Sequence, residues 1–369
     1  MSFGHTAQFV QITSSLDPKL GGPQNVVLET KDYFLKRYDS KIIIFGSSVR
    51  AFENSIKNST FRNNRYGFFF GIPKLEIRLA IKNANILLIH GYYLWSTLIT
   101  LYFSSTRNIF LMPHGSLELY QAKKGKYRKI IFKKLCNLLL KDRSIHFLVG
   151  SSSEIISVRE SFPNSKISVV GLGVELSNCI KINSRIHSPI KLFCLCRITN
   201  KKRIDLCIRA MSKLNEGNNE YHLDIYGSGD HFLENELKEL VEDLNLGEQV
   251  SFKGHVDGEL KDLAIQNSDI LLLPSENENF AVAVAESIAF GKPVVVSKFV
   301  AMHEFVDTHS TGLTIEALDV DELVCAIKDV TNKFSTFQEN CIASAPLLAW
   351  EEVIKNWFQV FENNLNIKK

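Results

Sequence analysis

The segment PSENENFAVAVAESIAFGKPVVV, residues 274–296, decides how this sequence is interpreted. It predicts the end of a strand, an acidic loop, a helix, a Gly-Lys-Pro turn and a second strand. Seven residues separate Glu278 from Glu286. In a helix that begins near Phe280, Glu278 lies at the start, and Glu286 lies about two turns further on, on roughly the same side.

Short apolar runs alternate with longer amphipathic stretches through nearly the whole chain. This alternation predicts βαβ units, and therefore an α/β fold with parallel sheets. The expected strands lie near residues 8–13, 41–45, 85–90, 108–112, 146–149, 167–170, 191–196, 222–226, 249–252, 269–274 and 293–297. The clearest expected helices cover residues 23–37, 117–140, 231–244, 282–290 and 320–330.

A chain of 369 residues suits two domains rather than one. A polar stretch without periodicity precedes the strand near residue 191 and predicts a linker there. We expect an N-terminal domain over 1–175, a linker over 176–190, a C-terminal domain over 191–345, and a last segment over 346–369 whose helix packs back on the first domain. Both domains are expected to be doubly wound and Rossmann-like, facing each other across a cleft, because such sheets bind ligands at the carboxyl ends of their strands.

The start of the helix beside Glu278 suits an anionic ligand. Its first backbone N–H groups are free and carry partial positive charge, which favours a phosphate. Carboxylates accept hydrogen bonds, so Glu278 and Glu286 suit sugar or ribose hydroxyls. The alternative is that Glu278 only caps the helix and Glu286 is a solvated residue. Glu286 argues against that alternative, because its neighbours in the helix are alanine, valine and isoleucine, among which a charge needs a partner.

A second segment, FCLCRITNKKRID over residues 193–205, places two cations at the end of a predicted strand. Arg197 ends that strand and Lys202 precedes the next helix. Two cations at the carboxyl edge of a Rossmann-like sheet can neutralise a departing diphosphate without a metal. The alternative is a basic surface turn, which is the interpretation we give to Lys201.

Together these segments resemble those of the retaining glycosyltransferases of the GT-B fold, specifically family 4, the glycosyl transferases group 1. That family carries a Glu-x7-Glu motif in this setting, and the resemblance covers nearly the whole chain. It implies two Rossmann-like domains, a nucleoside-diphosphate sugar as donor, retention of anomeric configuration, and no metal or other cofactor. The family's second segment reads Gly-Arg and then Lys-Gly, whereas here Cys196 and Arg203 replace the two glycines.

The resemblance also assigns roles to individual residues. The implied catalytic residues are Arg197, Lys202, Glu278 and His114. The implied substrate-binding residues are Gly21, Gly22, Gly227, Phe280, Ala281, Val282 and Glu286. His90, at another strand end, is a further candidate for the acceptor pocket. The simpler interpretations are that the glycines only form turns and that the segment after His114 only starts a helix.

Composition narrows the class of protein. A formal net charge of +3 gives no general attraction to nucleic acid. Seven cysteines without a CxxC pair predict neither a disulfide framework nor a zinc site. Asp319-Val320-Asp321 resembles a metal-binding Asp-x-Asp, but it opens a predicted helix, where Asp is a common cap. No other cluster of carboxylates or histidines suggests a metal site. The N-terminus shows no signal-peptide pattern, so we expect a cytoplasmic protein.

Residues Lys123 to Arg143 contain nine lysines or arginines and one acid. Tyr127, Ile130, Ile131, Leu135 and Leu138 recur among them at helical spacing. The pattern predicts either a basic amphipathic helix that rests on anionic lipid or an ordinary helix with a core face and a solvated basic face.

The resemblance therefore implies a metal-independent glycosyltransferase that moves a sugar to a saccharide or lipid-linked saccharide in surface polysaccharide synthesis. We expect it in the cytoplasm and, if the basic helix rests on lipid, at the inner face of the membrane. Two alternatives stay open: a sugar-nucleotide epimerase with the same architecture, and a catalytically silent nucleotide-binding protein.

Overall fold

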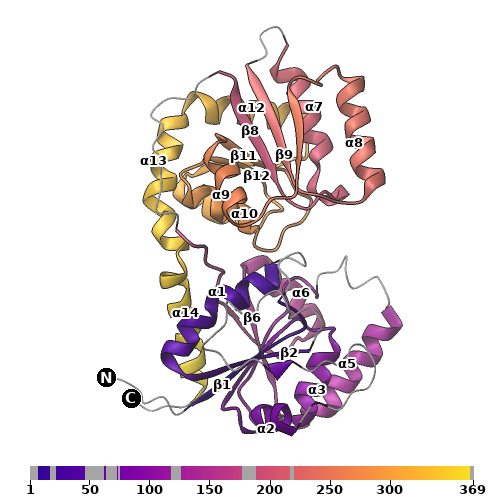
Figure 1. Ribbon diagram of the computed structural model, residues 1–369, viewed down its shortest axis with the longest axis vertical. Helices are drawn as coiled ribbons and strands as arrows, with labels where there is room; N and C mark the ends of the chain where they lie inside the picture. The colour runs from indigo at the N-terminus through magenta and orange to yellow at the C-terminus, as the bar shows by residue number, and fades with distance from the viewer. Residues whose placement is uncertain are drawn as a thin grey trace. The chain divides into compact units, whose positions relative to one another are not determined.

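The structure is a computed structural model that describes residues 7–16, 22–45, 62–63, 73, 75–117, 126–176, 188–216 and 220–365. The chain divides into two compact units, each built around a parallel sheet of its own (Figure 1). Unit 1 combines Met1–Leu172 with Val353–Lys369, and unit 2 comprises Gly173–Glu352.

Unit 1 contains a seven-stranded parallel sheet in the order β3-β2-β1-β4-β5-β6-β7. The strands are β1 (Gln8–Thr13), β2 (Asp39–Ile44), β3 (Arg62–Asn63), β4 (Ile86–His90), β5 (Ile109–Met112), β6 (Ile145–Val149) and β7 (Lys166–Val169). The helices are α1 (Gly22–Arg37), α2 (Leu75–Asn83), α3 (Trp95–Phe103), α5 (Lys126–Leu140), α6 (Ser152–Ser161) and, from unit 2 into unit 1, α14 (Trp350–Asn364).

The central strands of unit 1 are covered on both faces, as their almost continuous apolar runs predict. On one face Ile12, Leu87 and Leu111 pack into a core with residues of α2, α3, α5 and α6. On the other face Phe9 and Phe110 lie among aromatic rings of α1 and α14.

The last helix, α14, completes this second face. The ring of Phe361 lies 5.4 Å from that of Phe9 and 4.7 Å from that of Phe110, measured between centroids. Trp357 is fully buried, and its indole Nε1 donates to the carbonyl oxygen of Gly171 at 3.2 Å. From Val353 onward the helix belongs to unit 1, while its first turn belongs to unit 2.

Unit 2 contains a six-stranded parallel sheet in the order β10-β9-β8-β11-β12-β13. The strands are β8 (Ile190–Leu195), β9 (Tyr221–Tyr226), β10 (Val250–Gly254), β11 (Ile270–Leu273), β12 (Val294–Ser297) and β13 (Gly312–Ile315). The helices are η3 (Asn200–Lys202), α7 (Ile204–Leu214), α8 (His231–Asp243), α9 (Gly258–Gln266), α10 (Val282–Ala289), α11 (His303–His309), α12 (Val320–Asn332), α13 (Phe334–Ser344) and η4 (Ala345–Leu348).

The sequence of each element in unit 2 explains its place. The strands β11 and β12 are apolar throughout except for the final Ser297, and every residue in them is buried. In β9, buried and partly exposed residues alternate, with Leu223 and Ile225 facing the core that α7, α8 and α12 cover. The alternation marks a strand with one apolar face, toward the edge of the sheet.

The predicted α/β fold with parallel sheets is confirmed. Each expected strand is present, with limits within two residues of the prediction. The strands β3 and β13 were not predicted, because both are short and lack a clear apolar run. The helix expected over 117–140 is shorter at its start: Leu117 lies in a turn, residues 118–125 lie outside the described part, and α5 begins at Lys126.

One border of the units lies just before the predicted linker, and the other lies within the predicted last segment. Unit 2 begins at Gly173, and Val174 makes a parallel bridge with Ala349. Most of the predicted linker, residues 177–187, lies outside the described residues. Among the described helices, none has the length and apolar composition needed to cross a bilayer.

The aromatic packing of α14 generates a test of unit 1. We expect Phe361→Ala to lower the free energy of unfolding by about 3–5 kcal/mol, because it opens a cavity among packed rings. Glu362→Ala removes only an ion pair with Arg37 in which both side chains are 38% exposed, and should cost less than about 1 kcal/mol. Urea unfolding followed by circular dichroism compares the two variants, and equal losses would contradict this account of the helix.

Candidate functional site

The order of the strands in unit 2 identifies where a ligand can bind. The chain runs from β8 outward to β9 and β10, and then returns to the other side of β8 as β11. The loops that follow β8 and β11 therefore leave the sheet in opposite directions at a topological switch point, which is where open α/β sheets bind their ligands. The loop after β8 carries Arg197 and Lys202, and the loop after β11 carries Glu278.

These two loops are in direct contact. The backbone N–H of Glu276 donates to the carbonyl oxygen of Lys201 at 2.7 Å. The Nζ of Lys202 lies 2.6 Å from Glu278 Oε1, and the Nζ of Lys201 lies 3.3 Å from the same oxygen. The side chains of Lys202 and Glu278 are only 12% and 13% exposed, so this pair is largely removed from water. The structure thus brings together the cation and the carboxylate that the sequence analysis singled out.

Arg203 stands where the resemblance leads us to expect a glycine. Its φ of +53° is in the left-handed region, which costs about 1 kcal/mol for a residue with a side chain. The guanidinium is held by Asp205, with Nε and Nη2 each 3.0 Å from a carboxylate oxygen, and lies 3.6 Å from Glu276. Side-chain contacts therefore stabilise a backbone conformation that glycine adopts without strain.

Cys196 stands at the other position where the resemblance leads us to expect a glycine. Burial raises the pKa of its thiol to about 12, with the positive charge of Lys202 acting in the opposite direction. The thiol therefore stays protonated at neutral pH and is a poor nucleophile.

The start of α10 offers backbone donors next to Glu278. Ala281 precedes the helix with a φ of +59°, and its carbonyl accepts from the N–H of Val284 at 2.9 Å. The N–H groups of Val282 and Ala283, which precede this bond, have no acceptor within an α-helix, and this arrangement suits an anion. The backbone of Glu278 is tied to the neighbouring loop through Phe299 and Ala301, at 3.1 and 3.0 Å. Phe280 and Val282, the other residues predicted here, are partly buried.

Glu286 has the partner that its apolar surroundings require. Its carboxylate pairs with Lys261 of α9, and the two side chains are 16% and 26% exposed. Burial raises the pKa of Glu286, while the charge and hydrogen bond of Lys261 lower it. Lys261 was not predicted from the sequence, because it lies in a different helix from Glu286 and belongs to no recognisable motif.

The Gly-x-Gly turn after β9 has a packing role of its own. A Cβ at Gly227, where φ is +142°, would lie 1.9 Å from the carbonyl oxygen of Cys196. A Cβ at Gly229 would lie 2.0 Å from the carbonyl oxygen of Ile198. The two glycines thus let the turn press against the backbone on either side of Arg197. A role of Gly227 in substrate binding stays a prediction.

Three other predicted residues are less constrained. Arg197 is exposed and, in the described part of the chain, takes no part in the Lys202–Glu278 pair. Gly22 is the first residue of α1, with open space around the position of a Cβ. Gly21 lies outside the described residues.

In unit 1 three neighbouring strands bring two histidines together. The switch point of this sheet lies between β1 and β4. Gln11 of β1, His90 at the end of β4 and His114 after β5 form a chain, in which Gln11 Oε1 lies 3.2 Å from His90 Nε2, and His90 Nδ1 lies 3.0 Å from His114 Nε2. Burial lowers the pKa of His90 well below its usual range and that of His114 to about 3, so both rings are neutral.

The direction of these hydrogen bonds fixes which ring nitrogen carries each proton. With the Gln11 amide as oriented in the structure, its carbonyl oxygen can only accept, so His90 Nε2 donates. A neutral His90 then accepts at Nδ1, and His114 donates from Nε2. The Nδ1 of His114 is left as a hydrogen-bond acceptor. Gln11 was not predicted, although a glutamine within a buried strand is a signal.

Glu154 positions the turn that carries His114. This carboxylate is buried at the start of α6 and accepts from the N–H of Gly115 at 2.8 Å and of Gly150 at 3.2 Å. His114 itself has a φ of +51°. The strained backbone is thus held on its C-terminal side by a buried acceptor. Nothing in the sequence distinguishes Glu154 from other glutamates near a helix start.

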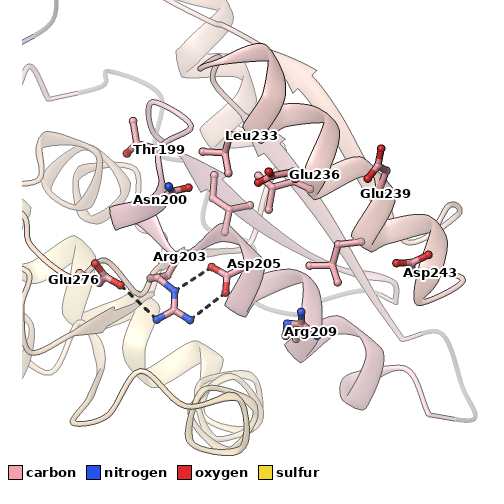
Figure 2. Close-up of a pocket in the computed structure, with 13 residues that line it drawn as sticks. Thr199, Asn200, Arg203, Asp205, Arg209, Leu233, Glu236, Glu239, Asp243 and Glu276 are labelled. Carbon is pink, nitrogen blue, oxygen red and sulfur yellow. Dashed lines mark hydrogen bonds and ion pairs between the residues drawn. The ribbon is translucent and has the colours of Figure 1, made fainter.

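A hollow of about 490 Å³ in unit 2 lies beside the loop after β8 (Figure 2). Asn200, Arg203, Glu276 and residues of α8 line it, whereas Lys202, Glu278 and Glu286 do not. Figure 2 shows Arg203 between Asp205 and Glu276. The other charged side chains that line it are three acids, Glu236, Glu239 and Asp243, and one base, Arg209. Their net negative charge would repel a diphosphate, so we do not assign the donor to this hollow.

Asp319 caps a helix, as predicted. Its side chain accepts from the N–H groups of Asp321 and Glu322 at 2.9 and 3.2 Å, at the start of α12. Within the ranges that the structure describes, no three His, Cys, Asp or Glu side chains are grouped so as to hold a metal.

Comparisons with known proteins bear on unit 2 most directly. Residues 179–346 match the model of the family described as glycosyl transferases group 1, a region that contains every predicted site residue of unit 2. The amylovoran biosynthesis glycosyltransferase AmsK of Erwinia amylovora is 30% identical over 157 residues, 41% of this chain and 38% of that protein. The glycosyltransferase MJ1607 of Methanocaldococcus jannaschii is 28% identical over 173 residues, 47% of this chain and 43% of that protein. The chain thus matches less than half the length of these relatives.

A solved structure extends the similarity to both units. Anabaena Alr3699/HepE in complex with UDP and glucose superposes with a TM-score of 0.71 at 15% identity, over 97% of this chain and 99% of that chain. Such a likeness shows the fold, which is the GT-B fold of glycosyltransferases, with an α/β unit of the Rossmann type in each half of the chain.

The neutral histidine pair generates a prediction about pH. In the unfolded chain both histidines titrate near 6.5, but in unit 1 their pKa values are lower, so below about 6.5 the unfolded state binds more protons. The free energy of unfolding should therefore decrease as pH falls, by up to about 1.4 kcal/mol per pH unit for each histidine. We expect His114→Gln to flatten this dependence between about pH 7 and pH 5 in thermal unfolding. Parallel curves for the two proteins would contradict neutral burial of His114.

Proposed function

We propose that the protein is a retaining glycosyltransferase of family 4 that moves a sugar from a nucleoside-diphosphate sugar to a hydroxyl group of a saccharide or lipid-linked saccharide. The observation that carries the proposal is the contact of Lys202 with Glu278 at the switch point of unit 2, beside the start of α10. The match of residues 179–346 to the glycosyl transferases group 1 supports it.

Lys202 and Arg197 are proposed to stabilise the departing diphosphate. Negative charge grows on the bridging oxygen as the bond to the sugar breaks, and a cation held in a poorly solvated site lowers the energy of that transition state. Glu278 already keeps the ammonium of Lys202 at this position. Because two cations can serve this purpose, the mechanism needs no metal ion.

The backbone donors of α10 and the carboxylate of Glu286 are proposed to bind the rest of the donor. The backbone N–H groups near Phe280, Ala281 and Val282 are proposed to donate hydrogen bonds to a phosphate of the donor. Glu286 accepts from the ribose hydroxyls, for which Lys261 now stands in as a donor of hydrogen bonds. Exchanging one donor for another keeps the buried carboxylate satisfied throughout binding.

In unit 1 we assign to His114 a contact with a hydroxyl of the sugar. Its Nδ1 is the acceptor that the hydrogen-bond chain from Gln11 leaves open, and its ring is neutral. Gly21 and Gly22, between β1 and α1, are proposed to let the backbone approach the substrate. His90 acts here as the group that orients His114.

Retention of configuration is proposed to follow from attack on the same face that the diphosphate leaves. The carbon–oxygen bond to the diphosphate breaks, the acceptor oxygen bonds to the same carbon, and the acceptor proton passes to the departing phosphate oxygen. No carboxylate nucleophile is needed in this scheme. The name of AmsK supports a role in surface polysaccharide synthesis, and the UDP bound to HepE supports a uridine nucleotide as the first donor to test.

Replacement of Lys202 tests the chemistry. We expect Lys202→Ala to lower the rate of UDP release from a UDP-sugar about 100- to 1,000-fold, as loss of one oxyanion-stabilising group does elsewhere. Lys213→Ala is the matched control, since that lysine also pairs with a carboxylate but is 46% exposed on α7. Chromatography of the sugar product separates transfer or hydrolysis from epimerisation. An unchanged rate in Lys202→Ala would remove this residue from catalysis.

Replacement of Glu286 tests the donor site. Glu286→Gln keeps the shape but weakens a charged acceptor, so UDP should bind roughly 10-fold more weakly in calorimetry. Glu316→Gln is the control, because Glu316 also pairs with a lysine but is 75% exposed. Equal affinities of the Glu286 variant and the control would show that this carboxylate does not bind the nucleotide.

A further inference from the structure

The helix α5 of unit 1 is apolar on the side that faces solvent. Tyr127, Ile131, Leu135 and Leu138 are 83%, 59%, 41% and 71% exposed. Their spacing of four, four and three residues places them in one line along the helix, about 17 Å long. We call this line the α5 stripe.

The opposite side of the same helix is the one that packs on unit 1. Cys136 and Leu140 are buried there, and Phe132 and Leu139 pack against the same core. Arg143, just after the helix, donates to the carbonyl oxygens of Leu139 and Leu140 of α5. It also donates to those of Leu101 in α3 and of Ser104, the residue that follows α3. The opposite face of α5 therefore attaches the helix to unit 1. The α5 stripe is a separate, exposed apolar surface.

Cations border the stripe on both sides. At 100° per residue, Arg128 lies beyond Leu135 on one side, and Lys134 lies beyond Tyr127 on the other. Both are exposed. The helix sequence KYRKIIFKKLCNLLL contains five basic residues and no acid. The charge pattern is complementary to a negatively charged surface.

Not every cation of the predicted basic segment takes part. Lys129 lies over the ring of Tyr93 and Lys133 over that of Phe162, at 4.8 and 4.7 Å, on the side that faces the protein. Arg143 is occupied by backbone carbonyls. The surface that remains combines the α5 stripe with Ile130, which is 44% exposed and lies beyond Lys134, and with the cations Arg128 and Lys134. It differs from an ordinary solvated basic face, which was the alternative that the sequence left open.

We propose that the α5 stripe docks unit 1 on an anionic lipid bilayer. The four apolar side chains enter the boundary between headgroups and acyl chains, while Arg128 and Lys134 bind lipid phosphates. An aromatic side chain such as Tyr127 suits this boundary because its ring is apolar and its hydroxyl is polar. Because α5 contains no acid, no part of the helix repels a uniformly anionic lipid surface, which favours this occupant.

This inference rests on unit 1 alone and adds a partner to the proposed function. A lipid-linked acceptor would be met at such a surface. Binding of UDP by unit 2 in calorimetry tests the donor site separately, so a failure of membrane docking and a failure of the proposed chemistry are distinguishable.

The experiment is sedimentation of the full chain with vesicles, made either of phosphatidylcholine alone or of phosphatidylcholine with phosphatidylglycerol. Ile131→Ser/Leu135→Ser removes the middle of the stripe and should weaken binding to the anionic vesicles about tenfold or more, because two apolar side chains lose their burial in lipid. Ile156→Ser on α6 is the matched control, with an isoleucine that is 64% exposed, and should bind as the unaltered protein does.

The flanking charges are tested in the same assay. Arg128→Gln/Lys134→Gln should weaken binding to anionic vesicles roughly twentyfold, and added salt should reduce binding of the unaltered protein. All variants are at exposed positions, and unchanged thermal unfolding confirms that they fold. Equal binding of the stripe variant and the control would overturn the proposal, as would binding that does not depend on lipid charge. Self-association that only the stripe variant abolishes, without vesicle binding, would identify a contact between copies and also overturn it.

Discussion

A single ion pair at the junction of two loops organises unit 2. The loops after β8 and β11 leave neighbouring strands, and the contact between Lys202 and Glu278, together with the backbone bond from Glu276 to Lys201, holds them together. The free energy lost when two charges leave water can equal or exceed the attraction between them. A buried ion pair therefore contributes little to stability by itself. Burial of this pair is expected where the ammonium of Lys202 must be held in position for a ligand. The left-handed backbone at Arg203, braced by Asp205, belongs to the same arrangement.

Much of this could be predicted from the sequence because the signals are local. Apolar runs predicted the strands, and the spacing of Glu278 and Glu286 predicted a carboxylate at the mouth of a helix and another within it. What the sequence did not reveal are partners brought from elsewhere in the chain. Lys261 reaches Glu286 from α9, and Gln11 reaches His90 from β1, and neither carries a pattern of its own. The strands β3 and β13 were not predicted for a different reason, since their few residues show no periodicity.

The two units use their switch points differently. In unit 2 opposite charges meet, and the carboxylate of Glu278 holds the ammonium of Lys202 beside the start of α10. In unit 1 the corresponding edge holds neutral, buried imidazoles whose protons are fixed by a glutamine, with the turn at His114 held by Glu154. A neutral acceptor with a fixed proton suits recognition of uncharged hydroxyls, whereas a cation suits phosphate. The chemistry of each edge follows from which polar residues end the central strands.

The helix α14 has a consequence for how the protein is made. Its rings fill the same core as Phe9, so the first strand of the chain and its last helix must meet before unit 1 is complete. During synthesis on the ribosome, Phe9, Phe34 and Phe110 emerge hundreds of residues before Phe361 does. Unit 2, whose residues are contiguous, can acquire its structure first. The aromatic surface of Phe9, Phe34 and Phe110 therefore stays uncovered until α14 has been synthesised, and in that interval it is a natural binding site for a chaperone.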